Sequence, residues 1–251
     1  MDLDTVSEHS WEWSWSPAAI VAGIFFVIPL AFTANFQYEN VLLTAIFCGI
    51  GVPLLIAGIA KWASEGLRQR HMQFGYSVSG IAIFIVSEAF IFLSMFASYW
   101  LARLSAYTWP PEGTPHIGLL LPVIMTVVLV SSSITIHMAE AKLHEGDVSG
   151  FKGMLGTTIL LGLIFFGMSM YEYNHLIQAG FGMSTNIYST AFYSITGFHA
   201  SHVLIGVFSF ITVLIPAFAG SINKTFVQCT AIYWHFVDVI WFFVVSQVYF
   251  W

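Results

Sequence analysis

Long apolar runs alternate with short polar breaks along almost the whole chain. Seven runs contain about 20 or more residues, which is the length an α-helix needs to cross the hydrocarbon core of a bilayer. They lie at 17–35, 40–61, 74–103, 117–138, 153–173, 188–219 and 227–250. The pattern predicts an all-α polytopic membrane protein with seven transmembrane helices.

The breaks between the runs predict how the helices are grouped. Residues 35–39 leave a very short connection, so we expect the first two runs to form an antiparallel hairpin over 17–61. A polar break at 62–73 then precedes the other five runs, which lie within 74–251. We therefore expect a two-plus-five arrangement: a hairpin, a linker and a five-helix bundle, preceded by an acidic N-terminal segment, 1–16.

Basic residues are distributed unevenly between the breaks. With seven helices, one side of the membrane carries six of the seven Lys and Arg residues, namely Lys61, Arg68, Arg70, Lys142, Lys152 and Lys224. Arg103 lies on the other side. Because cytoplasmic loops carry an excess of Lys and Arg, we expect a cytoplasmic N-terminus, a cytoplasmic linker and a C-terminus outside.

The overall composition agrees with a membrane protein and argues against several other classes. Hydrophobic residues make up 58% of the chain and charged residues 8%, against about 45–50% and 25% in soluble domains. A net charge of −6 without a basic cluster argues against a nucleic-acid partner. Cys48 and Cys229 lie inside apolar runs, so we expect free thiols and no sulfur-ligated metal.

Glu88 is the most informative polar residue within the runs. It lies midway along the third run, and no basic residue occurs within ten positions of it. An ionisable group at membrane depth is costly and usually functional. We therefore predict a proton-linked intramembrane carboxyl group at Glu88, acting as a proton relay or ion carrier. The alternative is a neutral carboxyl group that hydrogen-bonds a neighbouring helix or a lipid headgroup.

Histidines and an aspartate occur in the last two runs. His199 and His202 are spaced i,i+3. His235, which directly follows Trp234, has the same spacing from Asp238. His199 and His235 loosely meet the needs of a b-type haem, whereas copper would need three converging imidazoles. Hydrogen bonding between helices is the simpler interpretation, with His235 and Asp238 partly satisfying each other. We expect a structural polar motif here, with no catalytic residue and no metal ligand.

A dense polar and aromatic cluster occupies the break before the third run. It consists of Trp62, Glu65, Arg68, Arg70 and His71, and Lys224 is expected on the same side of the membrane. Basic groups at this level can bind phospholipid headgroups. We predict ordered phospholipid at these six residues, with ordinary positive flanking of the helices as the alternative.

Other polar residues near the ends of the runs have simpler interpretations. Glu172 lies between two tyrosines where the fifth run ends, so we expect it to be an interfacial anchor. His137, Glu140 and His144 follow one another at helical spacing near the end of the fourth run. We expect them to form a solvated face.

Five short stretches occur together in register on these runs. They are Ser87-Glu88, Trp109-Pro110-Pro111, Glu145-Gly146-Asp147, Gly197-Phe198-His199 with His202, and Tyr233-Trp234-His235-Phe236-Val237-Asp238. Together they closely resemble subunit III of the haem–copper terminal oxidases, in that family's order and over essentially the whole chain from about residue 17. The chain departs from mitochondrial-type members at Val78 and Gln228, where those members usually have Arg and Glu.

The resemblance implies a fold, partners and a role. It implies that the first two helices and the other five form the two sides of a V-shaped cleft that holds phospholipid. It also implies that the chain docks on subunit I in a complex that also contains subunit II. Haem and copper are then expected in the partner subunits and none in this chain. The implied role is support of assembly, lipid retention, proton uptake and turnover stability in a proton-pumping oxygen reductase of a bacterial inner membrane.

The resemblance leaves the electron donor open. Cytochrome c is the expected donor, and it would reach this chain only through the complex. The stretch 170–175, however, resembles subunit III of bacterial quinol oxidases more closely. Two alternatives lie outside this family. A stand-alone proton transporter or channel could use Glu88, although the chain lacks the matching halves typical of transporters. A haem-b membrane anchor could use His199 and His235.

Overall fold

The computed structural model describes residues 14–68, 74–220 and 222–250, without the side chains of Phe36, 62–68 and 74–77. All regular structure within this part of the chain is helical. The helices fall into two compact units, Met1–Met72 and Gln73–Trp251.

The first unit is a pair of helical spans. One span consists of α1 (Ser16–Phe25), the π-helical turn η1 (Phe26–Leu30) and α2 (Ala31–Phe36), and the other is α3 (Val41–Arg68). The widened turn η1 contains Pro29, which cannot donate a backbone hydrogen bond.

Glycines allow the two spans of the first unit to approach closely. A Cβ atom on Gly23 would lie 2.7 Å from the backbone nitrogen of Leu55, and one on Gly51 would lie 2.7 Å from a methyl group of Val27. Small residues commonly bring membrane helices together in this way. The pairing of the spans therefore depends on backbone contact rather than on large interlocking side chains.

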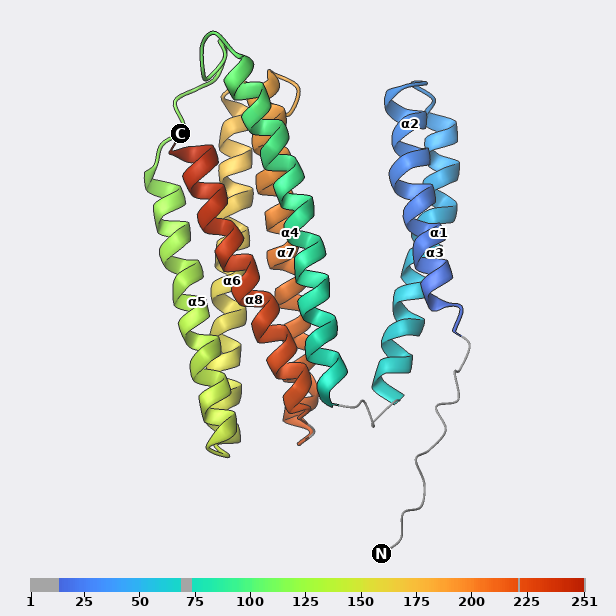
Figure 1. The fold of residues 1–251 in the computed structure, drawn as a ribbon, viewed down its shortest axis with the longest axis vertical. Helices are drawn as coiled ribbons and strands as arrows, with labels where there is room; N and C mark the ends of the chain where they lie inside the picture. Colours follow the sequence, from blue (N-terminus) through green and yellow to red (C-terminus); the bar gives the residue numbers. More distant parts are fainter. Residues whose placement is uncertain (1–13, 69–73, 221, 251) are drawn as a thin grey trace, which may run out of the picture. The chain divides into compact units, whose positions relative to one another are not determined.

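The second unit contains five long helices that run alternately up and down and lie side by side (Figure 1). They are α4 (Phe74–Ser105), α5 (Leu120–His144), α6 (Val148–Gln178), α7 (Ile187–Phe218) and α8 (Lys224–Val244), which continues into the π-helical turn η2 (Val245–Tyr249). Side chains of Asp147, Asn186 and Asn223 cap the first turns of the last three helices.

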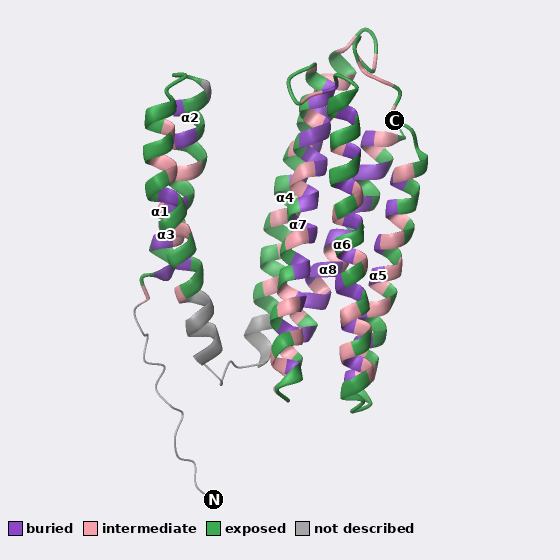
Figure 2. Ribbon diagram, turned by 180° about the vertical axis from the view of Figure 1, so that it is seen from behind, coloured by how far each residue is buried: buried purple, intermediate pink, exposed green. Residues whose placement is uncertain are grey.

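The core of the second unit surrounds α8, as Figure 2 shows by the buried faces that the helices turn toward one another. In the apolar window of the α8 span 56% of the residues are buried, against 11% for the α4 span. Trp234 and Trp241 are fully buried, and their indole nitrogens donate hydrogen bonds to Ser132 and Thr126 of α5 at 2.9 and 3.0 Å. These bonds satisfy the polar atoms of two large core side chains.

Seven helices long and apolar enough to cross a membrane occur in the described residues, which confirms the predicted class and helix number. Two helices extend well beyond their apolar runs. Leu120–His144 extends past the run 117–138, and Val148–Gln178 extends past 153–173 at both ends. The additional turns carry polar residues, which helical backbone tolerates once the apolar stretch has ended.

Candidate functional site

Glu88 on α4 lies beside His202 on α7. The Oε2 atom of Glu88 is 3.2 Å from Nε2 of His202, and their side chains are 15% and 6% exposed. The rings of Phe92 and Phe198 flank the imidazole at centroid distances of 5.2 and 4.5 Å. The carboxyl group therefore has a partner on a neighbouring helix. Its partner lies 114 positions away, so a search along its own helix does not find it.

The second ring nitrogen of His202 fixes how this pair shares a proton. Nδ1 lies 2.8 Å from the carbonyl oxygen of Phe198. A carbonyl oxygen can only accept, so Nδ1 carries a hydrogen. The contact between Nε2 and Glu88 then requires one more proton, either on the carboxyl group or on the imidazole. The pair is thus either two neutral groups or an ion pair, and its net charge is zero in both forms.

His199 and His235 bind different neighbours. The Nε2 atom of His199 donates to the carbonyl oxygen of Val237 at 3.1 Å, and its fully buried ring packs against Trp241. His235 Nδ1 lies 3.1 Å from the hydroxyl oxygen of Ser133 on α5. These contacts are the hydrogen bonds between helices expected from the sequence. Among the described residues, the structure shows no group of three or more His, Cys, Asp or Glu side chains arranged to hold a metal ion.

The expected contact between His235 and Asp238 is absent from the described structure. Both carboxyl oxygens of Asp238 are buried without a hydrogen-bond partner there, although the residue is only 6% exposed. Positions three apart differ by about 60° around a helix axis, so adjacent turns can face different neighbours. Here His235 faces Ser133, which leaves Asp238 without a partner.

Glu172 is a buried polar residue whose environment the sequence interpretation missed. It is 5% exposed, and the hydroxyl group of Tyr249 donates to its Oε2 atom at 2.6 Å. The expectation of an interfacial anchor was therefore wrong. The spacing of Glu172 from Phe165 and Ser169, both buried on α6, was the available signal, because residues three or four apart share a helix face.

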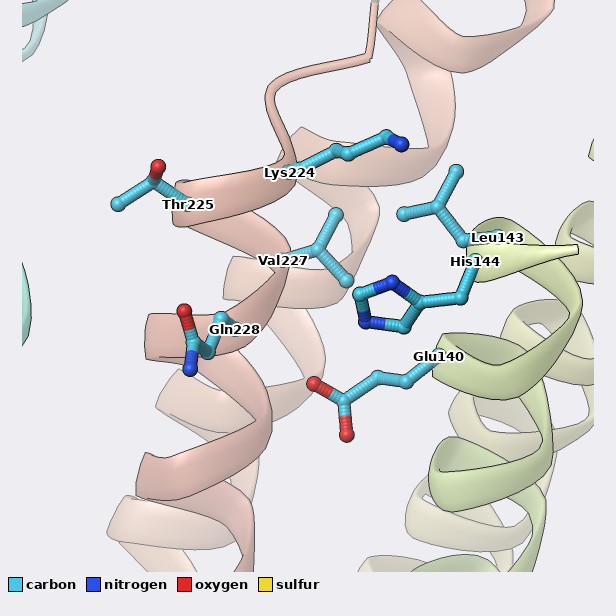
Figure 3. A pocket seen from close by; sticks show the side chains of 7 residues that line it. All are labelled: Glu140, Leu143, His144, Lys224, Thr225, Val227 and Gln228. Atoms are coloured by element: carbon cyan, nitrogen blue, oxygen red, sulfur yellow. The ribbon is translucent and has the colours of Figure 1, made fainter. Parts of the chain in front are cut away.

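A pocket of about 260 Å³ lies where α5 ends and α8 begins (Figure 3). It is lined by Glu140, Leu143, His144, Lys224, Thr225, Val227 and Gln228. Glu140 and His144 point from α5 toward α8, and the side chain of Lys224 extends back toward α5. Part of the predicted solvated face of α5 therefore lines a pocket.

Of the six predicted lipid-binding residues, Lys224 is the one whose side chain is described. The side chains of Trp62, Glu65 and Arg68 lie outside the described part, as do Arg70 and His71 entirely. The lipid-binding prediction for this cluster therefore stays a prediction.

Comparisons with known proteins show the family of this chain. The family model for cytochrome c oxidase subunit III matches residues 6–251. Cytochrome c oxidase subunit 3 of Synechocystis sp. is 38% identical over 68% of this chain and 73% of the relative. The protein of the same name from Branchiostoma lanceolatum is 31% identical over 94% of both chains. The chain therefore belongs to the cytochrome c oxidase subunit III family.

Proposed function

We propose that this chain is the non-catalytic subunit III of a proton-pumping haem–copper oxygen reductase, with cytochrome c as the electron donor of the complex. Family membership over residues 6–251 supports this proposal. The chain binds subunits I and II, contributes no redox centre, and supports assembly, phospholipid retention and steady proton uptake.

The contact between Glu88 and His202 is the observation that carries the proton-linked part of the proposal. Moving the shared proton from Oε2 to Nε2 turns two neutral groups into an ion pair without changing the net charge of the site. Aromatic rings flank the imidazole, and both side chains are largely buried, which strengthens the interaction between the two groups. Such a pair can adjust to a nearby change in charge by relocating one proton.

The membrane assignment extends to orientation. We place the chain in a bacterial inner membrane with its N-terminus in the cytoplasm. The helix ends on that side carry Lys61, Lys142, Lys152 and Lys224, which supports this orientation. The phospholipid site predicted from the sequence at Trp62, Glu65, Arg68, Arg70 and His71 belongs to the same proposal.

Co-purification tests membership of the complex. A tagged chain extracted in mild detergent should emerge with a haem–copper subunit, and its absence would contradict the proposal. Oxygen uptake by the purified complex with reduced cytochrome c, compared with a quinol, then identifies the donor. An optical spectrum of the chain purified alone should lack stoichiometric haem, which separates the proposal from a haem-b anchor.

Replacement of Glu88 tests the proton-linked role. The Glu88→Gln variant should keep its initial oxidase activity and lose activity faster during sustained turnover. The exposed Glu145, which pairs with Lys142 at 2.9 Å, offers a matched Glu145→Gln control that should behave as the unmodified complex does. Loss of initial activity in a correctly assembled Glu88→Gln complex would indicate a direct catalytic role instead.

A further inference from the structure

The pocket between α5 and α8 separates a negative wall from a positive one. Glu140, which is half-buried, lies on α5 four residues from the end of the helix. Lys224 is the first residue of α8, on the opposite wall. Figure 3 shows the carboxylate of Glu140 and the ammonium group of Lys224 as separate ends of one lining. This arrangement favours a ligand that carries both charges.

The helix dipoles act in the same sense as these side chains. The C-terminus of α5 carries partial negative charge, which favours a cation, whereas the N-terminus of α8 carries partial positive charge, which favours an anion. The two termini meet at this pocket. A bound zwitterion therefore has a preferred direction, with its cation toward Glu140 and its anion toward Lys224.

The position and floor of the pocket point to an amphipathic ligand. The membrane-spanning segments Leu120–His144 and Lys224–Tyr249 end and begin at its rim, so the pocket lies at the level of lipid headgroups. Leu143 and Val227 are buried in its lining and supply an apolar floor. Thus a charged headgroup can occupy the pocket while its acyl chains lie against the apolar part of the bundle.

The cationic end of the ligand is restricted by what the pocket offers. Quaternary ammonium groups are typically recognised by cages of Trp, Tyr and Phe rings, and none of these three side chains belongs to the lining described for this pocket. Glu140 instead offers carboxylate oxygens, which accept hydrogen bonds from a primary ammonium group. An uncharged headgroup would leave that carboxylate without a cationic partner from the ligand.

The neighbouring charged groups are compatible with this arrangement. His144 lines the pocket beside Glu140, and His137 is close enough to Glu140 to interact with it electrostatically. Lys142 is bonded to Glu145 at 2.9 Å. Lys224 is therefore the basic side chain of the lining on the wall opposite Glu140, and a ring nitrogen of His144 can donate a hydrogen bond to a phosphate.

We infer that the α5–α8 pocket binds the headgroup of an aminophospholipid, a phosphoethanolamine zwitterion, with its ammonium group on Glu140 and its phosphate on Lys224. The inference deepens the lipid-retention part of the proposed function, with which it shares Lys224. It uses only residues of the second unit and rests on the lipid-retention part of that proposal.

Lipid retention by the full oxidase complex tests the inference. Complexes are equilibrated with equal amounts of phosphatidylethanolamine, phosphatidylcholine and phosphatidylglycerol, washed, and analysed for retained lipid by mass spectrometry. The unmodified complex should retain phosphatidylethanolamine in preference to the other two. Glu140→Gln should reduce this preference about two- to fivefold, as expected for a partly solvated ionic contact. Lys224→Gln should weaken retention of all three lipids, because each carries a phosphate.

Matched variants and a lipid series make the result specific. Lys152→Gln removes a charge at the same end of the bundle, from a side chain that lies over the Phe218 ring at 5.2 Å, and should not change retention. Stepwise N-methylation of phosphatidylethanolamine removes its hydrogen-bond donors, so retention by the unmodified complex should fall at each step. This series uses the unmodified complex, so its result does not depend on whether a variant folds.

Several outcomes would overturn the inference while leaving membership of the oxidase complex intact. One is an unchanged lipid preference in Glu140→Gln, and another is equal retention across the methylation series. Displacement of the lipid by an equimolar amount of soluble O-phosphoethanolamine would indicate a soluble ligand instead, because the acyl chains would then add nothing to binding. Loss of the preference in an Arg68→Gln/Arg70→Gln variant, but not in Glu140→Gln, would place the lipid at the break 62–73.

Discussion

The Nε2 atom of His202 and the Oε2 atom of Glu88 lie 3.2 Å apart and share one proton, because Nδ1 of the same imidazole donates to the carbonyl oxygen of Phe198. The contact joins α4 to α7 inside the five-helix unit. It therefore serves as a link between helices as well as a proton-linked group.

A double-mutant cycle should detect this link. Glu88→Ala and His202→Ala should each destabilise the protein, and the double variant should lose less than the sum of the two. We expect a coupling free energy of about 0.5–1.5 kcal/mol, the range for net hydrogen bonds in proteins and within membranes. Unfolding of the full chain in mixed detergent micelles gives the measurement. Ser98→Ala, at an exposed position ten residues along α4 from Glu88, provides the control because its hydroxyl group bonds the carbonyl oxygen of Ser94 on its own helix and the change should be additive with Glu88→Ala.

Removal of the Tyr249 hydroxyl group should destabilise the same unit. Tyr249→Phe leaves the buried Glu172 carboxyl group without its 2.6 Å hydrogen bond, and we expect a loss of about 1–3 kcal/mol in the free energy of unfolding. Tyr171→Phe removes the same atom from a side chain that is 64% exposed. That control should change the stability by less than about 0.5 kcal/mol, and equal effects of the two variants would contradict the burial of Glu172.

Gly206 should not tolerate a side chain. A Cβ atom there would lie 2.6 Å from the ring of Trp234, so Gly206→Ala should destabilise the protein by about 1–3 kcal/mol through overpacking. Gly167 is exposed, with no atom within 4 Å of a Cβ at that position. Gly167→Ala should therefore leave the stability unchanged or raise it, because alanine favours the helix. Thermal denaturation of the two variants side by side makes the comparison, and equal stability would exclude the tight contact.

The orientation of the chain can be tested with topology reporters. Alkaline phosphatase fused after Trp251 should be active, since it folds outside the cytoplasm, and green fluorescent protein at the same point should be dark. Fusion after Gly146, which follows Lys142 at the opposite end of the bundle, should give the reverse result. Active phosphatase after Gly146 would invert the orientation that we propose.

The helices could be predicted from the sequence, whereas the contacts between them could not. Apolar runs of membrane length have few alternative structures, because backbone groups in lipid must be satisfied within the helix. The contact of Glu88 with His202 depends instead on how two helices are rotated and aligned. Glu172 was misinterpreted because its flanking tyrosines suggested an interface, while its exposure depends on Tyr249, which lies 77 positions away.

The linear spacing of residues also gave one wrong contact. His235 and Asp238 are close along α8, but the hydroxyl group of Ser133 on α5 lies beside His235 instead. Spacing within a helix limits which pairs can meet and does not decide which of them do. The choice depends on the neighbouring helix, whose alignment is set by the whole core.

The indole ring of Trp234 also limits how the bundle can move. The ring fills the space left by the missing side chains of Gly162 on α6 and Gly206 on α7, and its nitrogen donates a hydrogen bond to the hydroxyl oxygen of Ser132 on α5. A shift of α8 along its axis would drive the ring into the backbone of two helices and break a bond to a third. Trp234 thus fixes the alignment of four helices along their axes. Motion of the bundle as a rigid body therefore costs less free energy than sliding of its helices past one another.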